Sequence, residues 1–202
     1  SREGEVFHYP YHGGMFRCEP DGSNFEVFAH GLRNPQELAY DEYGNWFIVD
    51  NDGDFGDRER FHFLIEGTDT GWRATWQYRS NRKFAEHGGY NPWMADGLWK
   101  PHFDGQPAYL TPAISNYSDG PCGFAYNPGS ALNEKYRRHF FVTEFPGKNV
   151  RAFRTEPDGA GFKMVGEHVA HHGTMTTGIN FGADGALYLA DWGNNGWAPH
   201  EK

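Results

Sequence analysis

The sequence has few cysteines and no cysteine motif. Cys18 and Cys122 stand far apart and form no C-x-x-C pair, which excludes a zinc ribbon, a thioredoxin-like motif and a C-x-x-C-H haem attachment site. The two could form one disulfide if their Cα atoms came close enough, but two ordinary buried thiols are the favoured interpretation.

Basic residues and long apolar runs are also scarce. Against 27 Asp and Glu there are 18 Lys and Arg, giving a formal net charge of −9, and this balance argues against nucleic acid as a partner. No apolar run is long enough to span a membrane, and no basic segment followed by an apolar one opens the chain. If the protein is exported, its signal is expected either to have been removed or to lie upstream of Ser1.

Aromatic residues, glycine and proline are abundant. Hydrophobic residues make up 38% of the 202 residues, aromatics alone reach 17%, and there are 27 Gly and 12 Pro. This profile suits short strands joined by tight turns, so it predicts one all-β domain.

The chain contains an internal repeat. The segment at 16–31, FRCEPDGSNFEVFAHG, recurs at 153–169 as FRTEPDGAGFKMVGEHV, with Glu-Pro-Asp-Gly kept in both copies. Each copy is predicted to form two strands around a Pro-Asp-Gly turn, because Pro presets φ and Gly accepts a positive φ.

A second repeated element follows. The stretches at 37–51, 123–145 and 178–192 each show a short strand, a Gly-containing turn, and a strand rich in β-branched and aromatic residues. Each of these strands ends in an acidic residue: Asp50, Glu144 and Asp191.

Four-stranded units that repeat about every 40 to 60 residues are typical of propeller blades. Three or so blades cannot close a ring, so residues 1–202 are expected to form a partial β-propeller domain that covers about half of it. Because an unclosed ring would expose strand edges, these edges are expected to be completed by further chain or by another polypeptide. An insertion is expected at about 73–112. Its aromatic residues could stack on sugar rings or simply pack: Trp76, Tyr78, Tyr90, Trp93, Trp99 and Tyr109.

The segment DNDGDFGDRE at 50–59 is the densest acidic stretch. Calcium takes 6 to 8 oxygen ligands in a forgiving geometry, so this stretch predicts a calcium site; a solvated acidic turn is the alternative. The candidate ligands are Asp50, Asp52, Asp54, Asp57 and Glu59. His171 and His172 are not expected to share a metal, because adjacent residues of a strand point in opposite directions and the pair is expected in a loop.

The motif GLRNPQE at 31–37 carries a family resemblance. Followed by a strand, an acidic loop and the pair Gly71–Trp72, it resembles the soluble quinoprotein glucose and sorbosone dehydrogenases, whose fold is a six-bladed propeller. Stretches at 50–73, 119–129, 136–145 and 184–192 resemble the propeller of PVC-type haem-binding, membrane-bound dehydrogenase-like proteins of planctomycetes and verrucomicrobia.

This resemblance implies a function and a set of site residues. Arg33, Asn34 and Gln36 would contact substrate or pyrroloquinoline quinone, with Arg33 and Asn34 in the catalytic centre, although Arg33 could instead pair with a carboxylate of a neighbouring blade. Lys148 lies near a family lysine but is offset. The family's catalytic histidine would lie outside this chain, and a c-type cytochrome module would follow elsewhere.

One departure from the family bears on the cofactor. Where the family has arginines that hold the quinone, this chain has Thr174, Met175, Thr176 and Thr177. Taken as a whole, the resemblance implies a periplasmic or secreted, calcium-binding sugar or alcohol dehydrogenase-like propeller. The alternative is a noncatalytic, calcium-stabilised propeller that binds carbohydrate or a protein partner.

Overall fold

The computed structural model describes residues 4, 6–9, 12–52, 58–73, 101–106, 110–116 and 119–193. Within these ranges the chain is all-β: strands dominate, a short 3-10 helix η3 covers Glu134–Tyr136, and no α-helix occurs. No described helix has the length and apolar character needed to span a membrane.

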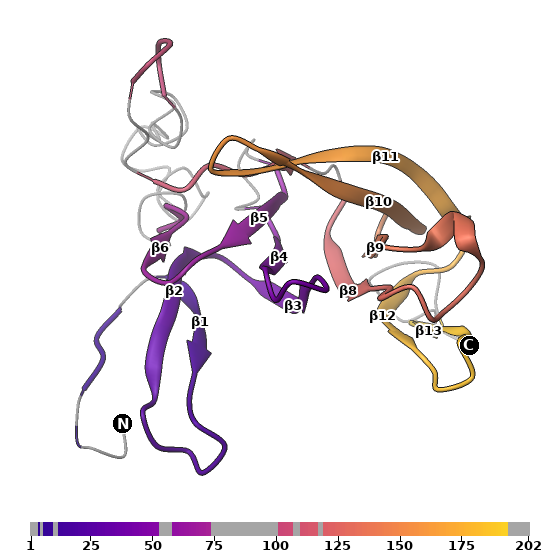
Figure 1. Ribbon diagram of the computed structural model, residues 1–202, viewed down its shortest axis with the longest axis horizontal. Helices are drawn as coiled ribbons and strands as arrows, with labels where there is room; N and C mark the ends of the chain where they lie inside the picture. The colour runs from indigo at the N-terminus through magenta and orange to yellow at the C-terminus, as the bar shows by residue number, and fades with distance from the viewer. Residues whose placement is uncertain are drawn as a thin grey trace, which may run out of the picture. The chain divides into compact units, whose positions relative to one another are not determined.

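The chain divides into two compact units, and their strands are labelled in Figure 1. The first comprises Ser1–Asn34, Asp52–Arg58 and Leu64–Ala113, and the second comprises Pro35–Asn51, Glu59–Phe63 and Ile114–Lys202.

The first unit contains a three-stranded sheet in the order β1-β2-β6. Its strands are β1 (Gly13–Arg17), β2 (Glu26–Leu32) and β6 (Thr68–Asp69). The pairing of β1 with β2 is antiparallel, and that of β2 with β6 is parallel.

The second unit contains two four-stranded sheets and a hairpin. The first sheet, in the order β3-β4-β5-β7, is built from β3 (Pro35–Tyr40), β4 (Trp46–Asp50), β5 (Arg60–Leu64) and β7 (Ser115–Asn116). The second, in the order β11-β10-β9-β8, is built from β8 (Pro121–Tyr126), β9 (Phe140–Glu144), β10 (Asn149–Asp158) and β11 (Gly161–His172). The hairpin is β12 (Thr176–Phe181) with β13 (Leu187–Asp191).

The core of the second unit lies between successive sheets. Phe47 and Val49 of β4 alternate with residues that face the other way, and they pack against Phe140 and Val142 of β9. On the opposite face of the β8–β11 sheet, Phe141 packs with Ile179 of the β12–β13 hairpin. Sheets stacked face to face in chain order are the packing expected of consecutive propeller blades.

The Glu-Pro-Asp-Gly repeat forms a hairpin in both copies, but the turns differ. In the first copy β1 ends at Arg17 and an eight-residue connection leads to Glu26. In the second, Pro157 belongs to β10, and the turn moves to Gly159 and Ala160, between the paired residues Asp158 and Gly161. The proline is tolerated there because β9 pairs with β10 only as far as Phe153, so no ladder hydrogen bond from position 157 to β9 is lost.

Two other predictions need correction. Cys18 and Cys122 are both free thiols, but Cys18 is exposed in the connection after β1 and Cys122 is half-buried, so the prediction of two buried thiols is wrong. His171 and His172 end strand β11 instead of lying in a loop. Their ring nitrogens meet different partners, Thr174 Oγ1 at 3.1 Å and Asn149 Oδ1 at 2.8 Å, as expected for opposite faces of a strand.

Candidate functional site

Three hairpins of the second unit present an acidic residue at the same place. In each, the first residue of the opening strand lies opposite the last residue of the second strand: Pro35 opposite Asp50, Pro121 opposite Glu144, and Thr176 opposite Asp191. The repeat of acidic strand ends predicted from sequence is therefore a repeat of structure.

Each of these hairpins is irregular next to its acidic end. The register shifts between Pro35 and Leu38, between Pro121 and Phe124, and between Thr176 and Gly178. Bulges of this kind re-aim side chains and are common beside functional sites. The shared strand end of the three hairpins is therefore the candidate site.

The first two acidic residues are buried and paired with arginine. Asp50 is fully buried, and its Oδ2 accepts a hydrogen bond from an Arg60 Nη of β5 at 2.6 Å. Glu144, 1% exposed, accepts through Oε2 from Arg151 Nε of β10 at 2.8 Å. In both sheets the arginine comes from the strand that follows the strand with the acidic residue. The same ion pair therefore occurs in both copies of the repeat.

Glu144 has an uneven set of partners. Its Oε2 also accepts from Asn149 Nδ2 at 3.1 Å, whereas Oε1 is buried and has no hydrogen-bond partner among the described residues. Arg151 makes a second ion pair with the more exposed Glu167, at 3.2 Å. The repeat identified Glu144 from sequence, but Arg151 was missed because its pairing depends on strand register.

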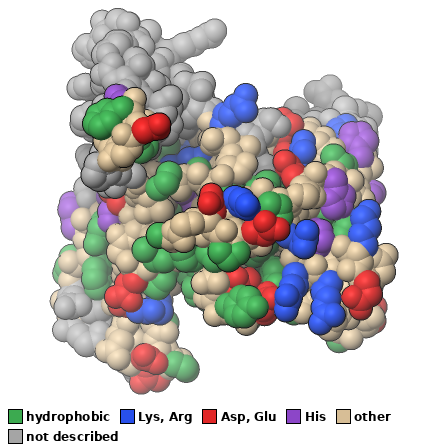
Figure 2. Space-filling view, turned by 45° about the horizontal axis from the view of Figure 1, so that its top comes forward, with side chains coloured by type: hydrophobic (Ala, Val, Ile, Leu, Met, Phe, Trp, Pro, Cys, Tyr) green, Lys and Arg blue, Asp and Glu red, His purple; other side chains and the backbone are tan. Residues whose placement is uncertain are grey.

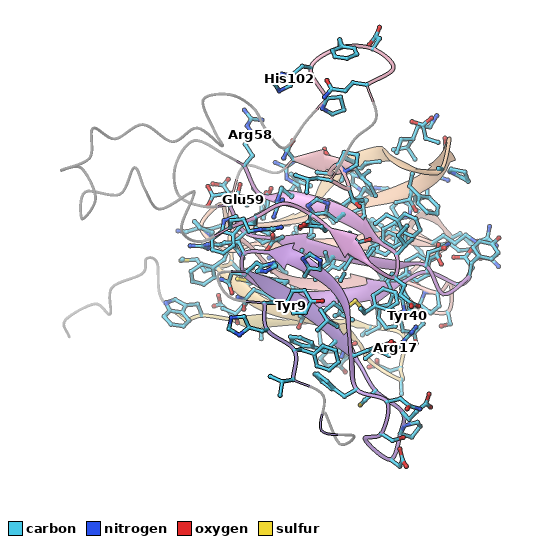
Figure 3. All side chains as sticks on the ribbon, turned by 90° about the vertical axis from the view of Figure 1, so that its left-hand side faces the viewer. Tyr9, Arg17, Tyr40, Arg58, Glu59 and His102 are labelled. Atoms are coloured by element: carbon cyan, nitrogen blue, oxygen red, sulfur yellow. The ribbon has the colours of Figure 1, made fainter. Side chains whose placement is uncertain are left out.

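The predicted calcium ligands are only partly described. Asp50 is buried against Arg60, and Asp52 is half-buried. Glu59, which is labelled in Figure 3, is a buried residue that directly precedes β5. Asp54 and Asp57 lie outside the described residues. Within the described ranges no cluster of three metal-ligating side chains occurs, and the arginine beside Asp50 offsets negative charge that a cation would need. The calcium site stays a prediction.

The Arg-Asn-Pro-Gln motif spans the connection from β2 to β3. Arg33 is half-buried and Asn34 is exposed, and both belong to the first unit. Gln36 is exposed on β3, in the second unit. Their predicted role toward substrate or cofactor stays a prediction.

Lys148 occupies the turn between β9 and β10. Its φ of 56° is in the left-handed region, its backbone N–H donates to the carbonyl of Phe145 at 3.4 Å, and its own carbonyl accepts from Gly173 N at 2.9 Å. The backbone at this position is thus part of the turn, and its side chain is half-buried.

The third hairpin begins with hydroxyls where the family resemblance leads one to expect arginines. Thr174 Oγ1 and Thr176 Oγ1 lie 3.0 Å apart, and Thr176 is fully buried. Hydroxyls can bind neutral oxygens but supply no positive charge. This segment therefore does not fit the cationic part of a clamp for a quinone that carries several carboxylates.

Glu37 is a site residue that sequence reasoning missed. Its Oε2 accepts a hydrogen bond from the backbone N–H of Phe124 at 2.6 Å and so joins β3 to β8. Burial raises the pKa of Glu37, although this hydrogen bond opposes the shift. Burial, and secondarily the charge of Glu37, raises the pKa of Cys122. No local sequence pattern predicts this contact, because Glu37 and Phe124 are 87 residues apart in the chain.

The chain matches one family model almost from end to end. Residues 3–196 match the family described as "Domain of unknown function (DUF7133)". No curated protein matches the chain.

Solved structures with a similar fold include three bacterial proteins described as sugar dehydrogenases. An oxidoreductase (glucose dehydrogenase) from Thermus thermophilus has a TM-score of 0.58 and 17% identity, covering 87% of this chain and 43% of that one. The PQQ-bound aldose sugar dehydrogenase of Streptomyces coelicolor has a TM-score of 0.58 and 17% identity, covering 94% and 48%. The apo form of the soluble aldose sugar dehydrogenase of Escherichia coli has a TM-score of 0.53 and 17% identity, covering 81% and 43%.

These similarities concern the fold. At 17% identity they show a shared architecture, and they confirm the prediction of an all-β chain that forms part of a propeller. The chain spans less than half the length of these solved relatives, between 43% and 48%.

Proposed function

The chain belongs to the DUF7133 family and has the fold of sugar dehydrogenase propellers, and from this premise we propose that it is part of a dehydrogenase-like propeller acting on a sugar or an alcohol. The observation that carries the proposal is the fold shared with several sugar dehydrogenases over most of this chain. The repeated strand end, with its bulges and buried acid–arginine pairs, supports it by offering a rigid rim for a site.

The proposed cofactors are calcium and pyrroloquinoline quinone. A similar solved structure is described as PQQ-bound, which supports the quinone. The calcium ligands would come from 50–59, and Arg33, Asn34, Gln36 and Lys148 would face the quinone. When bound, the quinone would supply a hydride acceptor. The fit is incomplete around Thr174 and Thr176, so no reaction step is assigned to this chain.

The remaining parts of the proposal concern the whole protein. We propose a periplasmic or secreted location, electron transfer to a c-type cytochrome module outside this chain, and a relationship to the PVC-type dehydrogenase-like proteins. The support for these is the motif resemblance at 31–37, 119–129, 136–145 and 184–192. The catalytic histidine would likewise lie outside this chain.

Dye-linked oxidation tests the proposed function. Full-length protein would be supplied with calcium and pyrroloquinoline quinone and assayed for dye reduction with a panel of aldoses and alcohols. We expect reduction with at least one of them, and a clear loss in Asn34→Ala, whose side chain is exposed and polar. The matched control is Asn133→Ala, which caps η3, is not part of the motif and should keep the activity. Absence of dye reduction with every sugar and alcohol would contradict the enzyme proposal.

A noncatalytic propeller that binds carbohydrate or a protein partner is the second candidate. The observation that favours it is the threonine pair at 174 and 176 in place of cationic side chains. This candidate predicts that the quinone leaves the absorption spectrum and the thermal midpoint of the protein unchanged, while calcium alone raises the midpoint. Quinone absorbance that stays with the protein through gel filtration would exclude it.

A further inference from the structure

Four of the seven residues that line a groove in the second unit carry cationic side chains. Its volume is about 610 Å³, and it lies between η3 and the hairpin formed by β10 and β11. The lining residues are Glu134, Lys135, Arg137, Arg138, His139, Arg154 and Gly166. A volume of this size is typical of small-molecule sites, which span about 300–1,000 Å³.

The positive charge of the groove is only partly neutralised. Arg138 pairs with Glu42 at 2.7 Å, and Arg137 approaches Glu134 only to 3.8 Å. Lys135 lies over the ring of Tyr136, and neither it nor Arg154 has a carboxylate partner in the described part of the chain. Two unmatched cations and one loosely paired one therefore face a single groove, in a chain whose net charge is −9.

The wall of the groove contains a buried histidine in a packed ring cluster. His139 is 7% exposed, and its Nδ1 lies 3.0 Å from the carbonyl of Arg137, which can only accept, so Nδ1 carries the proton. His168 stacks on Tyr136 and meets the His139 ring edge-on at 6.0 Å. Burial, with a further contribution from the charge of Arg154, lowers the pKa of His139, so the arginines and lysine supply the charge. Cationic heads held beside a packed wall are placed for bidentate binding of an oxyanion.

Figure 2 shows lysine, arginine and histidine side chains gathered in the right-hand part of the view, where β8–β13 lie. Acidic side chains dominate the chain as a whole, so a long polyanion would be repelled outside this groove, whereas a small anion would not. We propose that the groove of Lys135, Arg137, Arg138 and Arg154 is a binding site for the phosphate or sulfate group of a small molecule.

Titration calorimetry with inorganic phosphate and inorganic sulfate tests this site. We expect saturable binding at millimolar concentration that weakens as sodium chloride is raised. Arg154→Ala and Lys135→Ala should each weaken it by about tenfold, because each removes one charge-assisted hydrogen bond. Both side chains belong to exposed residues, so the variants should fold like the parent protein.

Lys163→Ala is the matched control. Lys163 is an exposed cation of β11 that pairs with Glu156 at 3.6 Å and does not line the groove, so its removal should leave the affinity unchanged. Tighter binding of phosphate than of sulfate would favour a phosphate ester as the ligand, and the reverse order would favour a sulfate ester. The proposal would be overturned if Lys163→Ala and Arg154→Ala lost the same amount of anion affinity, or if neither anion bound. It would also be overturned if only a long polyanion such as heparin bound. The readout is anion binding and does not depend on dehydrogenase activity.

Discussion

Glu144 and Glu167 both pair with Arg151, but one is buried and the other is partly exposed. The side chain of Glu144 is 1% exposed and that of Glu167 is 37% exposed. Removal of Glu144 takes away the buried carboxylate that pairs with Arg151 and leaves a cavity. The ion pair with Glu167, by contrast, is screened by water.

The two glutamates therefore predict unequal effects on stability. Glu144→Ala should lower the free energy of unfolding by about 2–3 kcal/mol, the loss being softened because one buried oxygen had no partner among the described residues. Glu167→Ala should lower it by less than about 1 kcal/mol. Urea denaturation measures both, and equal losses would show that Glu144 is not held in a buried ion pair.

Glu37 predicts a pH dependence. Burial raises its pKa above the ordinary value of 4.5, so the folded state favours the protonated form. The unfolded chain then binds fewer protons than the folded one, and this contribution to stability is present below pH 4.5 and is lost as the pH rises through the raised pKa. Glu37→Gln keeps an oxygen that can accept from Phe124 N–H but does not titrate.

The expected result is a stability difference between the parent protein and Glu37→Gln that changes with pH. As the pH rises from about 4 to 7, the free energy of unfolding of the variant should increase relative to that of the parent. Urea denaturation at several pH values measures this difference. A difference that is constant over this range, or that moves the other way, would mean that burial does not raise the pKa of Glu37.

At the scale of the elements, the contact between β8 and β12 depends on Gly123. A Cβ at Gly123 would lie 2.8 Å from the backbone nitrogen of Ile179, closer than real Cβ contacts, whereas one at Gly178 would lie 3.6 Å from the Cβ of Ala190. Gly123→Ala should therefore cost about 1–3 kcal/mol through overpacking, and Gly178→Ala less than about 1 kcal/mol. Thermal unfolding compares them, and similar midpoints would contradict close packing of these hairpins.

The hairpins are the elements that the sequence predicts best. Periodicity and turn residues are local, so the paired strands at 35–50, 121–144 and 176–191 can be recognised without a structure. The arginine partners of the acidic strand ends cannot be recognised in this way. Arg60 and Arg151 come to lie beside Asp50 and Glu144 only through the order of the strands and their register. The shift of the turn past Pro157 is also set by pairing, since it depends on where β9 stops.

At the scale of the whole molecule, the fold is predictable in kind but the site is not. Repeats indicate blades, and the similar sugar dehydrogenases confirm them, but this chain spans less than half of those proteins. Residues that complete a pocket in them need not have counterparts here. The roles in substrate, cofactor and metal binding therefore remain predictions for Arg33, Asn34, Gln36, Lys148 and the carboxylates of 50–59.

Calcium should stabilise the molecule if the 50–59 prediction holds. At a free concentration of about a hundred times its Kd, a ligand that binds only the folded state adds about 2.7 kcal/mol. We expect calcium to raise the thermal midpoint of metal-stripped protein, and Asp52→Asn to reduce this rise, while Asp158→Asn, an exposed acid at the β10 turn, should not. A midpoint that calcium leaves unchanged would favour a solvated acidic turn.

The most direct test of the proposed dehydrogenase-like site is an experimental structure of the full-length protein with calcium and pyrroloquinoline quinone. We predict density for the metal beside 52–59 and for the quinone against Arg33 and Asn34. Calcium density with no quinone beside Arg33 would contradict a quinoprotein and leave a binding propeller, and density at neither place would contradict both.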